Sequence, residues 1–423
     1  MTERANDTAW RLLDGKYGIV DAVNAHGFFR ISANQIKEFR EPRLMTKFDH
    51  AFELPLLFQE NKLSILAEKR GTYIIGRFET FQPVDANFDS AICHAGLPEY
   101  LQSFDLHGIS SEAVALNAAY TAGIIADFLG EEEVFPTVSG RQSSGTFSYA
   151  ITTLEGDELG IDVVNAQIEI DAGYEGLESL ALVEAKLDLS EDFMLRQLYY
   201  PYRAWASRVD KRVRPVFFVY ANRTFFLYEY EFGDMNRYGS ARIVQKARYS
   251  IEPTRISFDE IQSVFDNVRI MPEPEVPFPQ ANSMERILNL CERLDFRNLE
   301  QSEISEAYEF VGRQAHYYSA AAEYLGLVKK EGDGRVVLDT YGIDYLSKNY
   351  HDARLFICER LFEHKPFNEV FRLIIRNGEI PDKETVAAII ESNTKYSGST
   401  PLRRASTVIS WMRWVCSLAS EGD

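Results

Sequence analysis

Residues 167–202 read QIEIDAGYEGLESLALVEAKLDLSEDFMLRQLYYPY, and this stretch predicts the centre of the fold. Its first part reads as a strand, and the residues IEI lead straight to Asp171. The later run LALV is uninterrupted and apolar, so it predicts a strand buried on both faces. That run ends in Glu184-Ala185-Lys186, where burial is costly unless the two charges are paired or bind a metal ion.

The segment between the two runs, residues 176–179, is short enough for a hairpin turn. A hairpin would bring Asp171 beside Glu184, and strand alternation places Glu184 and Lys186 on one face. Two carboxylates and the Ala185 carbonyl suit Mg²⁺, while Lys186 can orient a water, or help to deprotonate it if its pKa is lowered. A simple buried Glu–Lys pair is the alternative interpretation.

The same residues carry a family resemblance, and in chain order they are Asp171, Glu184-Ala185-Lys186, Arg196-Gln197 and Tyr199-Tyr200. They resemble the PD-(D/E)xK nuclease superfamily and, within it, Type II restriction endonucleases, over about residues 105–232. The resemblance implies that Asp171 and Glu184 bind Mg²⁺. It also implies that Lys186 acts on the attacking water and that Gln197, or Tyr200, supports the site.

The chain departs from the family pattern at one position, because Ile170 stands where a proline usually precedes the aspartate. Asp171 is the preferred first carboxylate, since the strand-like IEI leads straight to it. Other acidic residues remain as rivals or as additional carboxylates, namely Asp162, Glu169, Glu175, Glu112 and Asp127.

Composition bounds the class of protein. The chain has 423 residues with 45% hydrophobic and 26% charged content, which is typical of globular protein and too long for one core. We find no run of about 18 apolar residues, so no membrane span is expected. The four cysteines form no CxxC pair, which indicates neither a disulfide framework nor a zinc cluster. A cytoplasmic location is expected.

The chain is acidic, with 45 Lys+Arg against 64 Asp+Glu and a net charge of −19. This balance argues against indiscriminate nucleic-acid binding, because a polyanion repels a polyanion. It leaves room for a localised basic groove.

The expected fold class is α+β and multidomain, with a central PD-(D/E)xK mixed sheet flanked by helices. The expected domains are 1–95, an α+β module with possible DNA recognition; 96–270, the catalytic domain; 271–282, a proline-rich linker; 283–350, a winged helix; and 351–423, a helical or second winged-helix-like domain. Within these, residues 7–39 are expected to be largely helical, and residues 190–208 to form a helix capped by Ser190 and ended or kinked by Pro201.

Several residues are suited to DNA contact by side-chain chemistry. The ordinary alternative is a solvated surface for most of them, a place in the core for Tyr317, and protein binding or dimerisation for the winged helix as a whole. A Gly-flanked loop supplies Arg141, Gln142, Ser143 and Ser144, and the end of the helix after the ExK motif supplies Arg203. The longer helix of the winged helix supplies Arg313, Gln314 and Tyr317, and the C-terminal helix supplies Arg403 and Arg404.

The sequence therefore predicts a Mg²⁺-dependent, sequence-specific hydrolase of double-stranded DNA, acting as a homodimer on a two-fold site. A cognate DNA methyltransferase is the expected partner in the same system. The alternatives are a winged-helix DNA-binding regulator, a non-specific repair nuclease, and an interaction scaffold with a nuclease-like fold and a dead site.

Overall fold

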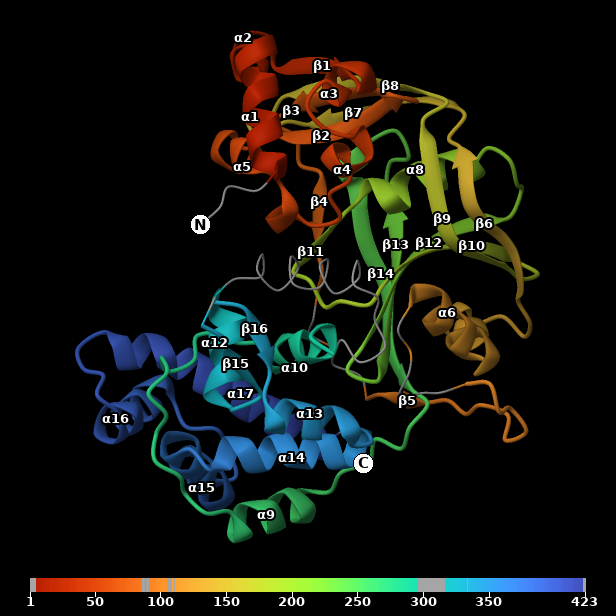
Figure 1. Cartoon of the computed structure of the whole chain (residues 1–423). Coiled ribbons are helices and arrows are strands. Elements are labelled where there is room, and N and C mark those ends of the chain that lie inside the picture. Colours follow the sequence, from red (N-terminus) through yellow and green to blue (C-terminus); the bar gives the residue numbers. More distant parts are fainter. Residues whose placement is uncertain are drawn as a thin grey trace.

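A computed structural model describes residues 5–85, 88, 91–104, 109, 111–295, 316–332 and 334–420. It has an N-terminal α+β part, a central mixed sheet and a mostly helical C-terminal part (Figure 1). Within these residues no helix is both long and apolar enough to cross a bilayer. The four cysteines, all in the described ranges, are free thiols.

The N-terminal part packs short helices on a β-ribbon around the buried residues Trp10 and Phe58. Its elements are α1 (Ala5–Tyr17), α2 (Ile19–His26), β1 (Phe28–Ser32), α3 (Ala33–Lys37), α4 (Pro42–Thr46), α5 (Leu56–Asn61), β2 (Ser64–Lys69) and β3 (Thr72–Gly76). Strand β1 corrects the helical expectation for residues 7–39. Gly27 ends α2 in the left-handed region at φ 79°, and β1 then pairs with β3.

A five-stranded sheet joins the N-terminal part to the central part. Its order is β1-β3-β2-β8-β7, where β7 (Thr146–Thr152) and β8 (Glu158–Val164) are a hairpin from the central part of the chain. The hairpin leaves the central sheet at Asn165, whose φ of 52° turns the chain between β8 and the next strand. Two separately expected domains therefore share one sheet.

The central sheet has seven strands in the order β5-β14-β13-β12-β10-β9-β6. Their bounds are β5 (Cys93–His94), β6 (Phe135–Ser143), β9 (Gln167–Glu175), β10 (Ser179–Lys186), β12 (Arg212–Ala221), β13 (Thr224–Phe232) and β14 (Ala241–Ser250). The expected hairpin is confirmed, since β9 and β10 are antiparallel. Strand β12 runs parallel to β10 on its other side, so β10 is buried along its whole length.

Helices cover both faces of this sheet (Figure 1). On one face lie α6 (Glu112–Thr121) and α7 (Ile124–Leu129), which are separated by Gly123 at φ 75°. On the other face lies α8 (Arg196–Trp205), preceded by the short strand β11 (Asp192–Met194), which pairs with β4 (Phe81–Pro83). Helix α8 therefore starts later than expected. Ser190 is not its cap, and Pro201 lies within the helix without ending it.

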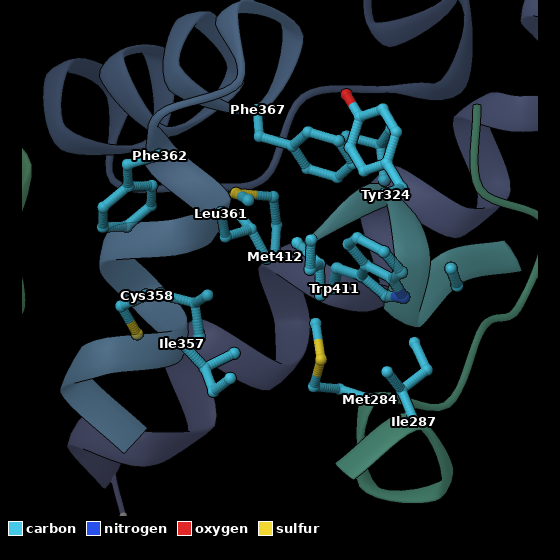
Figure 2. Packing of buried hydrophobic residues seen from close by; sticks show 14 of the residues in the cluster. Met284, Ile287, Tyr324, Ile357, Cys358, Leu361, Phe362, Phe367, Trp411 and Met412 are labelled. Carbon is cyan, nitrogen blue, oxygen red and sulfur yellow. The ribbon is translucent and has the colours of Figure 1, made fainter. Parts of the chain in front are cut away.

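The C-terminal part is built around one continuous apolar cluster that extends from Ile256 to Leu418. Figure 2 shows Trp411 and Phe367 in its middle, and their rings stack with centroids 5.2 Å apart. The helices are α9 (Phe258–Asn267), α10 (Met284–Arg293), α12 (His316–Tyr324), α13 (Thr340–Ser347), α14 (Tyr350–Phe362), α15 (Lys365–Asn377), α16 (Lys383–Asn393) and α17 (Thr400–Ser420). The strands β15 (Val328–Lys330) and β16 (Val336–Leu338) form an antiparallel hairpin where a wing was expected.

This cluster changes the expected boundaries in two ways. It spans both sides of residue 350, so the two expected C-terminal domains share one core. It also includes Ile261 and Phe265 of α9, which the sequence assigned to the catalytic domain. The proline-rich segment 271–280 carries no helix or strand, as expected, and crosses from α9 to α10.

Candidate active site

The middle of β9 and the end of β10 bring the predicted carboxylates together. Val183 pairs with Ala172 in the antiparallel register. Glu184, which follows Val183, and Asp171, which precedes Ala172, therefore lie opposite each other. The backbone N–H of Ala185 donates a hydrogen bond of 2.8 Å to Asp171 Oδ2. In an extended strand the N–H and C=O of one residue point to the same side, so the Ala185 carbonyl also points toward Asp171.

Glu184 and Lys186 share the face of β10 that α8 covers. Each is only 6% exposed, and Lys186 Nζ donates a hydrogen bond of 2.6 Å to Glu184 Oε1. Gln197, in the first turn of α8, donates from Nε2 to the same Glu184 oxygen at 2.5 Å. Lys186 and Gln197, both predicted members of this site, thus contact Glu184 directly.

A fourth member comes from the N-terminal part, and the sequence did not predict it. Asp49 Oδ2 lies 3.4 Å from Lys186 Nζ, and Asp49 Oδ1 accepts a hydrogen bond of 3.2 Å from Gln197 Nε2. Asp49 lies far from the motif in the chain and outside any strand, so no periodicity pointed to it. The basic residues around it, Arg43 and Lys47, were the one available signal.

Burial and crowding of like charges shift the pKa values of the acids. Burial, reinforced by Asp171 and Asp49 and opposed by Lys186, raises the pKa of Glu184 to about 8. Burial also raises the pKa of Asp171 and of Glu112, a further carboxylate at the site. Asp49 differs: burial would raise its pKa, but the charge of Lys186 and other cations holds that pKa below its usual value.

The pKa of Lys186 is governed by its acidic neighbours. Burial alone would lower this pKa, but Glu184, Asp49 and Glu112 together raise it well above its usual value. Lys186 is therefore an ammonium in this arrangement. It can hold a water or a phosphate oxygen, whereas the alternative role as a base requires that a bound cation first neutralise the surrounding carboxylates.

These groups line a cavity of about 790 Å³ between the N-terminal part and the central sheet. Its wall also carries basic side chains, namely Arg43, Lys47, Lys69, Arg70, Arg141, Arg196 and Arg293. Four of them, Arg43, Lys47, Lys69 and Arg70, are exposed and come from the N-terminal part, and we call these four the basic rim. In the part of the chain that the structure describes, no ion pair engages the basic rim.

The donor set fits a hard divalent cation. Asp171, Glu184 and the Ala185 carbonyl offer only oxygen, which suits Mg²⁺ and not zinc. Gln197 Oε1 is buried without a hydrogen-bond partner among the described residues, and a cation-bound water would satisfy it. No group of three His, Cys, Asp or Glu side chains in the described ranges forms a ready metal cage, so waters and substrate would complete the coordination.

Three of the five rival acidic residues lie elsewhere or are otherwise engaged. Asp162 is on β8, in the five-stranded sheet, and accepts a hydrogen bond from Ser148. The other engaged rivals are Glu175, which pairs with Lys211, and Asp127, which accepts a hydrogen bond from Tyr249. Glu169 and Glu112 do line the cavity. Tyr200, the alternative to Gln197, is fully buried and donates its hydroxyl to the Ala67 carbonyl.

The expected DNA-reading loop is mostly strand. Residues Arg141, Gln142 and Ser143 belong to β6, at the edge of the sheet, and Arg141 reaches the cavity while paired with Glu169 at 3.4 Å. Ser144 is 2% exposed and donates to the Gly145 carbonyl, so it is not available to a phosphate. Of these four residues, Arg141 is thus the one that lines the cavity.

Two other predicted DNA contacts prove to be buried. Arg203 is 9% exposed and donates to the carbonyls of Ser148 and Met235, which makes it a structural residue. Arg404 is 6% exposed, whereas its neighbour Arg403 is exposed.

The expected winged-helix contacts are tested only in part. Tyr317 is 52% exposed at the start of α12, but Arg313 and Gln314 lie outside the described residues. The cations of the β15–β16 hairpin are paired locally, Lys329 with Asp339, Lys330 with Glu323 and Arg335 with Glu331. These pairs neutralise much of the positive charge that a DNA-binding wing would use.

Three stretches of the chain match models of domains of unknown function: residues 7–75 (DUF6996), 76–250 (DUF6997) and 286–420 (DUF7226). No curated protein and no solved structure matches the chain. The cavity takes Asp49 from the first stretch, Asp171, Glu184, Lys186 and Gln197 from the second, and Arg293 from the third. The chain is similar to each domain over those residues, and its candidate site is assembled from all three.

Proposed function

We propose that this protein is a Mg²⁺-dependent nuclease that hydrolyses phosphodiester bonds of double-stranded DNA. The observation that carries the proposal is the convergence of Asp171, Glu184 and Lys186 at one end of the β9–β10 hairpin, inside a cavity with a basic rim. A buried and a half-buried acid, Glu184 and Asp171, both with raised pKa values and next to a lysine, favour a cation site over a simple ion pair.

Each residue has a role that its contacts support. Asp171, Glu184 and the Ala185 carbonyl would hold Mg²⁺, which when bound supplies charge neutralisation at the phosphate and a water of lowered pKa. The Lys186 ammonium orients the attacking water or stabilises the charge that develops on the phosphate. Gln197 keeps Glu184 in place through its amide N–H.

The charge distribution supports a nucleic-acid substrate despite the net charge of −19. Arg43, Lys47, Lys69 and Arg70 line the same cavity as the acids, so they can bind phosphates on either side of the scissile bond. The acidic remainder of the surface would repel DNA elsewhere and favour this one orientation.

By its resemblance the protein is proposed to be a Type II restriction endonuclease that acts in the cytoplasm. Sequence-specific cutting then calls for a homodimer on a two-fold site and for a DNA methyltransferase that protects the host sequence. The β15–β16 hairpin with α12 is the proposed winged-helix element, and Tyr317 is its exposed candidate for contact with DNA. Arg403, on α17, is a second exposed candidate outside this element.

Incubation of linear phage DNA with the protein, in Mg²⁺ or in EDTA, tests the proposal. Discrete fragments that need Mg²⁺ are the expected result, and Glu184→Ala and Lys186→Ala should each abolish them. A smear would favour a non-specific repair nuclease. Intact DNA that the wild-type protein nevertheless binds would favour a winged-helix regulator.

A further inference from the structure

Asp49 contacts both residues that hold Glu184. Its Oδ2 lies 3.4 Å from Lys186 Nζ and its Oδ1 accepts from Gln197 Nε2 at 3.2 Å. Those same two donors bond Glu184 Oε1, at 2.6 and 2.5 Å respectively. Lys186 and Gln197 are thus shared between a carboxylate of the central sheet and a carboxylate of the N-terminal part.

The backbone of Asp49 is fixed from several directions. Its carbonyl accepts a hydrogen bond of 2.8 Å from the N–H of Met194 in β11, and its own N–H donates to Glu53 Oε2 at 2.7 Å. The next residue, His50, is buried and pairs with Asp188 at 3.3 Å, just beyond the end of β10. Asp49 is therefore held in position by contacts that do not involve its own side chain.

We infer that Asp49 is a positioning residue of the active site, supplied by the N-terminal part to hold the Lys186 ammonium and the Gln197 amide while Glu184 binds a cation. This inference rests on the proposed nuclease function and deepens it. It makes the N-terminal part a component of the catalytic site in addition to its basic rim.

The physical reason is that the Glu184 carboxylate would share its negative charge between a cation and its donors Lys186 and Gln197. A carboxylate that binds a cation gives up part of its hold on other partners, because the cation withdraws its negative charge. Lys186 would then keep Asp49 as its remaining anionic neighbour in contact. Without Asp49, a buried ammonium beside a bound cation would be free to turn away from the phosphate.

The test compares Asp49→Asn with Asp49→Glu and with a matched control, Glu53→Gln, in the full chain. Glu53 bonds the backbone of Asp49 and His50 but is not among the residues that line the cavity, so its loss disturbs the same loop. Initial rates on linear phage DNA in Mg²⁺ are measured as a function of DNA concentration. Ca²⁺-supported DNA binding and the thermal midpoint are measured for each variant.

For Asp49→Asn we expect a maximal rate about 10- to 100-fold below wild type, the usual effect of losing an outer partner of a metal site. The DNA concentration at half-maximal rate, the Ca²⁺-supported DNA affinity and the thermal midpoint should stay unchanged. Asp49→Glu should recover most of the lost rate, and Glu53→Gln should cut at close to the wild-type rate.

Two results overturn the inference alone: a wild-type maximal rate for Asp49→Asn, or equal losses for Asp49→Asn and Glu53→Gln, which would indicate that only loop structure matters. A wild-type protein that does not cut at all would remove the proposed nuclease function, and this inference with it.

Discussion

The carboxylate of Asp171 accepts a hydrogen bond of 2.8 Å from the backbone N–H of Ala185, the middle residue of Glu184-Ala185-Lys186. This hydrogen bond links the middle of β9 to the charged end of β10. By strand geometry the Ala185 carbonyl points to the same side of β10 as this N–H. The hairpin thereby concentrates negative charge at one point of a buried sheet, and the consequences of that charge can be measured.

Cation binding should depend on pH through Glu184. The pKa of this residue is raised to about 8, first by burial and then by Asp171 and Asp49, so a proton competes with a metal ion below that pH. We expect Mg²⁺ or Ca²⁺ affinity to fall about tenfold for each pH unit below 8 and to level off above it. Calorimetric titration at pH 6.5, 7.5 and 8.5 measures this. An affinity independent of pH would contradict it.

The same shift fixes the sign for the stability of the metal-free protein. An acid with a raised pKa in the folded state binds protons that the unfolded chain, near its ordinary value of about 4.3, has already lost. The stabilising contribution of protonated Glu184 to the free energy of unfolding is therefore present at low pH and lost as pH rises through about 8. Glu184→Gln should flatten the dependence of the free energy of unfolding on pH between about 4.3 and about 8.

The basic rim should govern the salt dependence of DNA binding. Lys69→Ala with Arg70→Ala removes two exposed cations at the cavity. The slope of log affinity against log salt should fall by about 0.9 for each phosphate that the protein no longer neutralises. Fluorescence anisotropy in Ca²⁺ measures it. As a control, Lys383→Ala with Lys395→Ala removes equal charge from exposed positions in the C-terminal part and should leave the slope unchanged. Equal slopes for the two double variants would show that the rim does not bind DNA.

The buried pair of His50 and Asp188 should stabilise the junction between the N-terminal and central parts. Burial would lower the pKa of His50, but Asp188 and its other partners raise it to about 9. The contribution of this ion pair to the free energy of unfolding is complete at pH values below the ordinary histidine pKa of about 6.5 and is lost as pH rises through about 9. His50→Ala should cost roughly 3–5 kcal/mol near pH 6, with a smaller cost at pH 10.

Chemical denaturation at the two pH values measures this difference. His351 is the control, because it pairs with Glu260 but its side chain is 31% exposed. His351→Ala should cost less than about 1 kcal/mol at either pH. A cost for His50→Ala that does not change with pH would mean that the ion pair contributes nothing.

Asn222 should anchor the C-terminal part to the central sheet. It sits in the β12–β13 turn at φ 53°, and its Nδ2 donates to the carbonyl of Glu285 in α10 at 2.7 Å. Asn222→Gly removes this anchor, while Asn222→Ala adds about 1–2 kcal/mol of left-handed strain. Asn165, also left-handed at φ 52° but outside this junction, should show the same Gly–Ala difference without the loss of an anchor. Denaturant unfolding measures both pairs, and an Asn222→Gly variant as stable as wild type would show that there is no such anchor.

Much of the architecture could be predicted because it follows from local patterns. The β9–β10 hairpin follows from the strand-like residues up to Asp171 and from the apolar run before Glu184. The β12–β13 hairpin follows from two aromatic strands around Asn222-Arg223, both of which adopt positive φ. The C-terminal helices follow from their apolar spacing.

What could not be predicted depends on contacts between distant segments. Strands β7 and β8 look like members of the central sheet, but the pairing of β8 with β2 is decided by tertiary packing and not by local sequence. Helix α9 joins the C-terminal core for the same reason. Asp49 reaches Lys186 only because the junction around His50 positions it, and one sequence carries no sign of that junction.

Whether Glu184 holds a catalytic cation is measured by single-turnover cleavage of DNA in Mg²⁺ by the wild-type protein and by Glu184→Gln. The glutamine keeps the size of the side chain and an acceptor for Lys186, but it removes the charge that would hold the cation. We expect rapid cleavage by the wild type, a rate for the variant more than about 100-fold lower, beyond what loss of an outer partner causes, and equal DNA binding in EDTA, where no cation is bound. Cleavage by Glu184→Gln at the wild-type rate would contradict this expectation.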